Sequence, residues 1–202
     1  MKKIVLFDFD GVIVDTCDLS FEISNGFRPT LSKNEYLTWF EGSIYDRPKH
    51  KNRKDENEDF FKIYNPRLME TYPISGIEDV LGSLHKKYLL VVVSSTISSS
   101  IEEYLSKFNL LQYFDKVFGS DVHKSKVEKI NMVFSEYGVG SGDCIFVTDT
   151  LGDMREAEHT GVNAIGVSWG IHPVETLQRG NPVAIVHGVS GILTEIDGYF
   201  KV

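Results

Sequence analysis

Apolar runs rich in Val, Ile, Leu and Phe alternate along most of the chain with segments of helical periodicity. The runs themselves show little apolar–polar alternation, which is typical of strands that are covered on both faces. Strands separated by helices pair in parallel, with helices on both sides of the sheet. The sequence therefore predicts an α/β protein with a three-layer, Rossmann-like parallel sheet. We expect strands at 4–10, 88–95, 116–121, 143–149 and 163–169, an edge strand at 183–188, and helices at 76–88, 98–114, 125–139 and 152–162.

Residues 18–73 break this alternation. They contain no strand-like run. Aromatic residues and leucines are scattered among polar residues, and the segment is interrupted by Pro29, Pro48 and Pro66. We interpret this segment as a small helical domain inserted after the first strand. The core domain would then comprise residues 1–17 and 74–202.

Composition limits the classes of partner. A net charge of −8 disfavours non-specific binding to nucleic acid or to anionic membranes, and no stretch is long enough to span a bilayer. Cys17 and Cys144 lie far apart, each beside an apolar run, so we expect two free thiols and a reducing, cytoplasmic location. We expect a monomer or a homodimer with a small-molecule substrate.

Polar side chains stand at the ends of the expected strands. In parallel sheets, ligands bind outside the carboxyl ends of the strands, so these side chains should meet at one edge. Carboxylates together with a hydroxyl and an ammonium group suit a divalent cation plus an anion, and Mg²⁺ with a phosphoryl group fits best. The residues concerned are Asp8, Asp10, Ser94, Ser95, Lys124, Lys126, Asp149 and Asp153.

Four stretches, "DFDGVIVDT", "VVVSS", "HKSKVEKI" and "TDTLGDMREAEHTG", resemble in order the four motifs of the haloacid dehalogenase (HAD) superfamily. A later stretch, "VSWGIHPVETL", is similar to the phosphoglycolate-phosphatase-like members. The resemblance spans about residues 1–17 and 74–190. It implies the HAD fold and a Mg²⁺-dependent phosphatase, and it makes the insert a helical cap of the C1 type.

The resemblance also implies a role for each matching residue. Asp8 would be the nucleophile that forms an aspartyl-phosphate, and Asp10 the acid and base that protonates the leaving oxygen and then activates water. Ser94 and Lys124 would hold the phosphoryl oxygens, helped by backbone N–H groups near Phe9 and Ser95. Mg²⁺ would bind the Asp8 carboxylate, the Asp10 carbonyl, Asp149, and Asp153 directly or through water.

Two lysines compete for the third motif. The interval from Lys124 to Ile130 matches the usual spacing from lysine to apolar residue in this motif, so we prefer Lys124. Lys126, at the start of the expected helix, is the alternative. Thr16, where the insert begins, is interpreted as a hinge or helix-cap residue.

The insert also carries the stretch "YDRPKHKNRK" over residues 45–54. Runs of charge usually face water, and acidic residues follow this one directly. The alternative is that the insert closes over the site and brings cations onto a second anionic group of the substrate. Arginine suits such a contact because its planar fork binds a carboxylate through two hydrogen bonds, so Arg47 and Arg53 are the candidates.

Other functions share parts of this pattern. A phosphoacceptor receiver carries its acidic pair on the first strand and its phosphoacceptor on the third, where this chain has lysines. A HAD-like binding or regulatory protein of weak activity, and a phosphomutase of the same superfamily, are the alternatives to a phosphatase. A dehalogenase would not need Asp10, so its presence favours phosphate chemistry.

Overall fold

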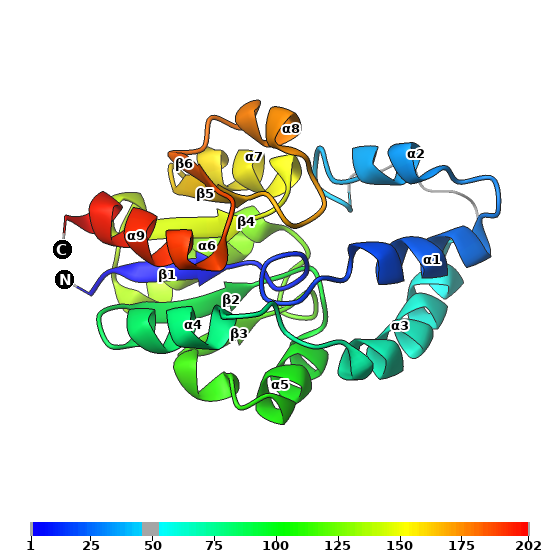
Figure 1. Cartoon of the computed structure of the whole chain (residues 1–202), viewed down its shortest axis with the longest axis horizontal. Helices are drawn as coiled ribbons and strands as arrows, with labels where there is room; N and C mark the ends of the chain where they lie inside the picture. The colour runs from blue at the N-terminus through cyan, green and yellow to red at the C-terminus, as the bar shows by residue number, and fades with distance from the viewer. Residues whose placement is uncertain (1, 46–52, 202) are drawn as a thin grey trace.

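In a computed structural model, which describes residues 2–45 and 53–201, the described chain forms a six-stranded sheet with helices on both faces (Figure 1). All neighbouring strands are parallel, in the order β3-β2-β1-β4-β5-β6. The predicted fold class is thereby confirmed, edge strand included. The strands are β1 (Ile4–Phe7), β2 (Leu89–Val93), β3 (Lys116–Phe118), β4 (Cys144–Thr148), β5 (Asn163–Val167) and β6 (Ala184–Val186).

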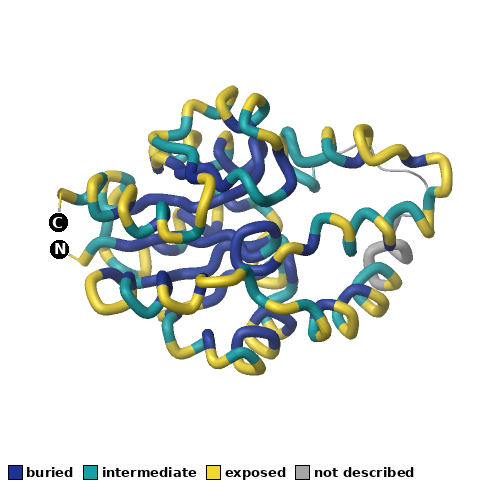
Figure 2. The backbone as a smooth tube through the Cα atoms, in the orientation of Figure 1, coloured by how far each residue is buried: buried dark blue, intermediate teal, exposed yellow. Residues whose placement is uncertain are grey.

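Alternate residues of the strands pack into two hydrophobic layers. On β1, Val5 and Phe7 face one layer, whereas Ile4 and Leu6 face the other. The strands are therefore buried on both faces, which explains their continuous apolar sequences (Figure 2). The first layer includes helices α4 (Ile77–His85), α5 (Ser98–Lys107) and α9 (Val189–Phe200); the second includes α6 (Lys126–Tyr137) and α7 (Leu151–His159). Beside β5, the short helix α8 (Val174–Gln178) packs on α7 through Leu177 and Met154.

Local signals define several helix ends. Helix α6 begins after Ser125, whose hydroxyl accepts a hydrogen bond from the Glu128 N–H, and ends at Gly138 with φ +64°. The predicted helix 98–114 is wrong in its second half. Helix α5 ends at Lys107 because Asn109 takes a left-handed conformation, φ +57°, and a 3₁₀ turn, Leu111–Tyr113, follows. A second 3₁₀ turn, Ser141–Asp143, precedes β4.

Between β1 and α4 lie helices α1 (Cys17–Phe27), α2 (Lys33–Thr38) and α3 (Arg53–Glu70), which we call the helical insert. The chain leaves and re-enters the core side by side, since Val14 pairs with Pro73 in an antiparallel bridge. The insert stands at one end of the molecule, opposite both termini (Figure 1). Among the described residues, no helix combines the length and apolar character needed to cross a bilayer.

Candidate active site

Three buried carboxylates meet at the carboxyl end of the sheet. Asp8 directly follows β1, Asp149 follows β4, and Asp153 lies in the first turn of α7. One carboxylate oxygen from each lies within 4.8 Å of the others, and the side chains belong to residues at most 8% exposed. We call these three residues the Asp cluster. The sheet topology thus brings together three of the four predicted metal ligands.

Glycines make this close approach possible. The backbone turns sharply after Asp10 at Gly11, whose φ is +73°. A Cβ atom added there would lie 1.9 Å from Asp149 Oδ2, and one added to Gly170 would lie 2.3 Å from the same oxygen. A side chain at either position would therefore displace Asp149.

Lys126 is the cation that contacts the Asp cluster. Its Nζ lies 2.8 Å from Asp8 Oδ2 and 2.7 Å from Asp153 Oδ2, and the residue is 2% exposed. Lys124 is exposed, and its Nζ lies 5.5 Å above the ring of Tyr45. The geometry therefore favours Lys126 over the sequence-based preference for Lys124. As the first residue of α6, Lys126 points to the sheet edge, whereas Lys124 lies in the loop before the helix.

Burial and crowding disfavour full ionisation of the Asp cluster. Burial raises the pKa of Asp8 well above its usual range, with Lys126 opposing and the other two carboxylates adding to the shift. Burial likewise raises the pKa of Asp149 to about 7. Although burial acts to raise the pKa of Asp153 too, Lys126 and hydrogen bonds lower it overall. The nearby Lys126 therefore does not offset the cost of ionising all three carboxyls.

The cluster fits a hard divalent cation. Asp149 Oδ1 is buried and has no hydrogen-bond partner among the described residues, although Oδ2 accepts a bond from the Ile171 N–H at 2.7 Å. A buried carboxylate oxygen without a donor is costly, and a metal ion would satisfy it. An all-oxygen set of carboxylates suits Mg²⁺, which is bound in proteins through few carboxylates.

A second buried lysine supports the loop after β2. Lys129 Nζ donates a hydrogen bond to the carbonyl oxygen of Ser94, and both residues are 0% exposed. The Thr96 N–H in turn donates to Ser94 Oγ at 3.1 Å. Ser94 thus directly follows β2, the strand that pairs with β1. The Phe9 N–H, one of the backbone donors expected for the phosphoryl group, donates to Asp8 Oδ1 at 2.8 Å.

Asp10 is held apart from the Asp cluster by three hydroxyl groups. Its Oδ1 accepts hydrogen bonds from Thr16 Oγ1 at 2.8 Å and from the Tyr64 hydroxyl. Its Oδ2 accepts one from Thr96 Oγ1 at 2.7 Å. Thr16 does precede helix α1, but its side chain makes no capping bond there. It holds Asp10 instead, a role that the interpretation as hinge or cap did not include.

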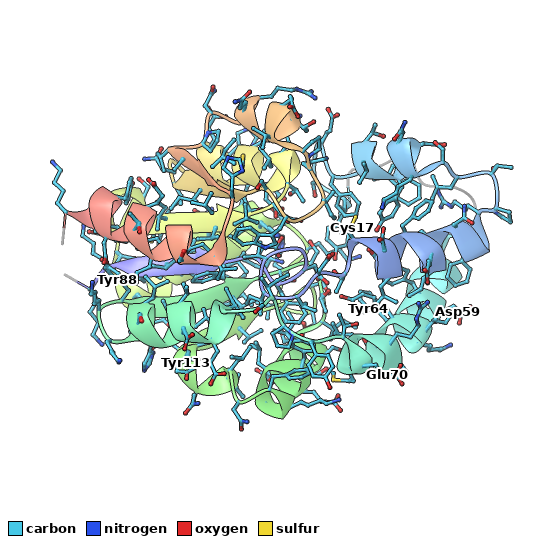
Figure 3. All side chains as sticks on the ribbon, viewed as in Figure 1. Cys17, Asp59, Tyr64, Glu70, Tyr88 and Tyr113 are labelled. Carbon is cyan, nitrogen blue, oxygen red and sulfur yellow. The ribbon has the colours of Figure 1, made fainter. Side chains whose placement is uncertain are left out.

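Tyr64 belongs to α3 of the helical insert (Figure 3). Burial raises the pKa of its phenol well above the usual range, and the neighbouring Asp10 carboxylate adds to this shift. The phenol therefore acts as a neutral donor toward Asp10.

The segment after α2 lies against the core beside the site. The Gly152 N–H donates to the Phe40 carbonyl at 2.8 Å, and Arg155 donates to the Glu41 carbonyl at 2.5 Å. Further along, the Tyr45 hydroxyl donates to the Ser95 carbonyl at 3.2 Å. The helical insert thus reaches both α7 and the loop after β2. Of the predicted cap cations, Arg47 and the side chain of Arg53 lie outside the described residues.

Three residues near the site were missed from the sequence. Lys129 carried a usable signal, because it follows Lys126 by three residues on α6 and so shares its face. Thr96 directly follows the "VVVSS" stretch. Tyr64 carried none, since its contact with Asp10 joins residues 54 positions apart through the path of the insert.

Comparison with known proteins agrees with this geometry. Residues 5–167 match the family model described as haloacid dehalogenase-like hydrolase. The chain is 29% identical to a probable phosphatase, IndB, of Dickeya dadantii, over 96% of this chain and 93% of that protein. It is 22% identical to the phosphoglycolate phosphatase of Synechococcus elongatus, with 95% and 96% covered. A predicted phosphatase from Clostridium acetobutylicum superimposes with a TM-score of 0.83 at 21% identity, covering 97% of this chain and 98% of that one.

Proposed function

Because the chain belongs to the haloacid dehalogenase-like hydrolases, we propose that this phosphatase is Mg²⁺-dependent, hydrolyses a small phosphorylated metabolite, and does so through an aspartyl-phosphate. The observation that carries the proposal is the Asp cluster with Lys126 paired to two of its members. Three carboxylates and one ammonium group leave two negative charges when all are ionised. A bound divalent cation would balance them.

Asp8 is the proposed nucleophile. Its Oδ1 is fixed by the Phe9 N–H and its Oδ2 by Lys126, so the carboxylate is oriented before substrate arrives. One Asp8 oxygen would bond to phosphorus while the bond from phosphorus to the ester oxygen breaks, and Asp10 would give that leaving oxygen a proton. Water would then attack the phosphorus of the aspartyl-phosphate and lose a proton to Asp10, which releases phosphate and restores Asp8.

The other site residues would bind and neutralise charge. The Asp8 carboxylate, the Asp10 carbonyl, Asp149 and Asp153 would hold Mg²⁺, which when bound would offset the charge of the transferred group. Ser94 and Lys126 would contact phosphoryl oxygens. Lys126 takes the place that we gave to Lys124 from the sequence.

The helical insert is proposed to be a cap that selects the substrate, with domain limits at residues 18–73. Its support is the hydrogen bond from the Tyr45 hydroxyl to the carbonyl of Ser95, the residue after Ser94. A cap packed this close favours a small substrate. Cys17 and Cys144 are both free thiols, and this supports a reducing, cytoplasmic location.

The first test measures phosphate release from p-nitrophenyl phosphate. We expect Asp8→Asn to abolish release because an amide is a poor nucleophile, and we expect EDTA to do the same to the wild type until Mg²⁺ is restored. Exposed Asp59 gives the matched control, Asp59→Asn, which should retain wild-type activity. Full activity of Asp8→Asn would refute the mechanism. Conversion of a hexose phosphate to its isomer, without release of phosphate, would identify a mutase instead.

A further inference from the structure

We infer that Tyr64, on α3 of the helical insert, is a positioning residue that holds the Asp10 carboxylate so that its Oδ2 serves as the proton-transferring oxygen. The inference rests on the proposed role of Asp10 as acid and base. It adds a residue outside the motif positions, contributed by the insert rather than by the core.

The hydrogen bonds distinguish the two oxygens of Asp10. An ionised carboxylate offers about four lone-pair sites, two on each oxygen. Thr16 and Tyr64 both donate to Oδ1, which fills its sites, whereas Thr96 alone of the described residues donates to Oδ2. Oδ2 therefore keeps one site for a proton.

Asp10 Oδ2 also lies on the side of the proposed phosphoryl subsite. Its partner Thr96 follows Ser94, the proposed phosphoryl contact, and the Thr96 N–H is bonded to Ser94 Oγ at 3.1 Å. The oxygen that remains free is thus the one next to the phosphoryl subsite. Oδ1 is turned toward α1 and α3 through Thr16 and Tyr64.

The Tyr64 hydroxyl is itself fixed by packing. The residue is 2% exposed, its ring stacks on Phe60 with centroids 5.4 Å apart, and Phe61 packs edge-on at 6.1 Å. A threonine hydroxyl can rotate away from its acceptor, but a phenol held by its ring cannot leave without moving α3. Tyr64 therefore restricts Asp10 more strongly than the two threonines do.

Tyr64→Phe tests this role, with Tyr36→Phe as the matched control. Tyr36 is also a buried tyrosine of the insert, 3% exposed, but its hydroxyl donates to Ser20 Oγ at 2.8 Å rather than to Asp10. An alkyl phosphate needs a proton on its leaving oxygen, and p-nitrophenyl phosphate hardly does. We expect Tyr64→Phe to lower kcat about 10-fold or more with glycerol phosphate and less than about 3-fold with p-nitrophenyl phosphate, at unchanged KM. Equal losses with both substrates, or the same pattern in Tyr36→Phe, would overturn the inference.

A second measurement needs no activity. Urea unfolding of Tyr64→Phe, Asp10→Ala and the double variant gives the coupling between the two side chains. We expect the effects of this pair to be non-additive and those of Tyr36→Phe with Asp10→Ala to be additive. Additivity in both pairs would refute the Tyr64 contact.

The failure of the proposed function and the failure of this inference give different results. If Asp8→Asn kept full activity, the proposed function would fail while the unfolding cycle still tested the contact. If Asp8→Asn were inactive and Tyr64→Phe lacked a leaving-group effect, only the inference would fail.

Discussion

Two buried lysines on one face of α6 shape the electrostatics beneath the candidate site. Lys126 pairs with Asp8 and Asp153, and this pairing raises the pKa of its ammonium group against the opposing effect of burial. Lys129 has no such carboxylate contact at hydrogen-bond distance among the described residues, and burial lowers the pKa of its ammonium group to about 8. The sequence marked the first lysine only as an alternative, because spacing to Ile130 does not determine which side chain turns inward.

Replacement of each motif lysine separates the two candidates. Lys126→Met should lower phosphate release about 100-fold or more, because it removes the buried charge that would stabilise the transferred group in the proposed mechanism. Lys124→Met should change it less than about 3-fold, since that residue is exposed. Steady-state kinetics with p-nitrophenyl phosphate measures both, and melting curves show whether each variant is folded. A large loss in Lys124→Met alone would return the role to Lys124.

Lys129 predicts a specific dependence of stability on pH. Its pKa is about 8 in the folded chain against 10.5 as the reference value, so the unfolded state binds more protons between these pH values. The free energy of unfolding contributed by Lys129 therefore rises with pH across this window. The total rise is on the order of 3 kcal/mol, from about 1.4 kcal/mol per pH unit.

Urea unfolding at pH 7, 8.5 and 10 tests this dependence on wild type and Lys129→Met. The stability of wild type relative to Lys129→Met should increase with pH, whereas the difference between wild type and the exposed variant Lys124→Met should stay nearly constant. A flat difference for Lys129→Met would contradict the proposed burial of a titrating ammonium group.

At the scale of elements, sequence patterns were most reliable where the structure of a helix or strand depends on its own residues rather than on distant contacts. Continuous apolar runs predicted each strand found in residues 2–45 and 53–201, and both faces of β1 and β4 are buried. The end of α5 was missed because Asn109, not a glycine, takes the left-handed conformation. The docking of the segment after α2 onto α7 could not be predicted, because it depends on the path of the insert between distant residues.

The contact between Gly152 and this segment depends on glycine having no side chain. A Cβ atom at Gly152 would lie 2.4 Å from the Gly42 carbonyl oxygen and 2.8 Å from that of Phe40. Alanine favours a helix over glycine by about 1 kcal/mol, so Gly152→Ala should leave α7 folded while it displaces the segment. We expect hydrogen exchange of amides in residues 37–45 to be about 10-fold faster. Gly26→Ala, in α1, is the control and should leave these amides unchanged, because the added Cβ would have no atom of another described segment within 4 Å. Unaltered exchange in Gly152→Ala would show that the contact does not hold the segment.

At the scale of the whole molecule, the Asp cluster lowers the stability of the folded chain. Folding removes three carboxylates from water and brings them within 4.8 Å, in a chain whose net charge is already −8. Such a cluster is expected where a ligand supplies the missing charge, and natural proteins accept this cost at functional sites. From the sequence, the order of strands and motifs was enough to predict that Asp8, Asp149 and Asp153 meet, but it also placed the Asp10 carboxylate with them. Their burial and the unpaired oxygen of Asp149 needed the three-dimensional structure.

Mg²⁺ should therefore raise the melting temperature of the wild type. An ion that binds the folded chain alone adds about 2.7 kcal/mol at 100 times its Kd, which corresponds to about 5–10 °C for a chain of this size. Asp149→Asn should lose most of this Mg²⁺-dependent rise, because it removes a charge beside the unpaired oxygen. The same variant should melt higher than wild type in EDTA, since like charges in a buried site repel. Asp59→Asn, on the exposed side of α3 (Figure 3), should respond to Mg²⁺ and EDTA as wild type does. An equal Mg²⁺ response in Asp149→Asn and wild type would place the ion elsewhere and remove the Asp cluster as its site.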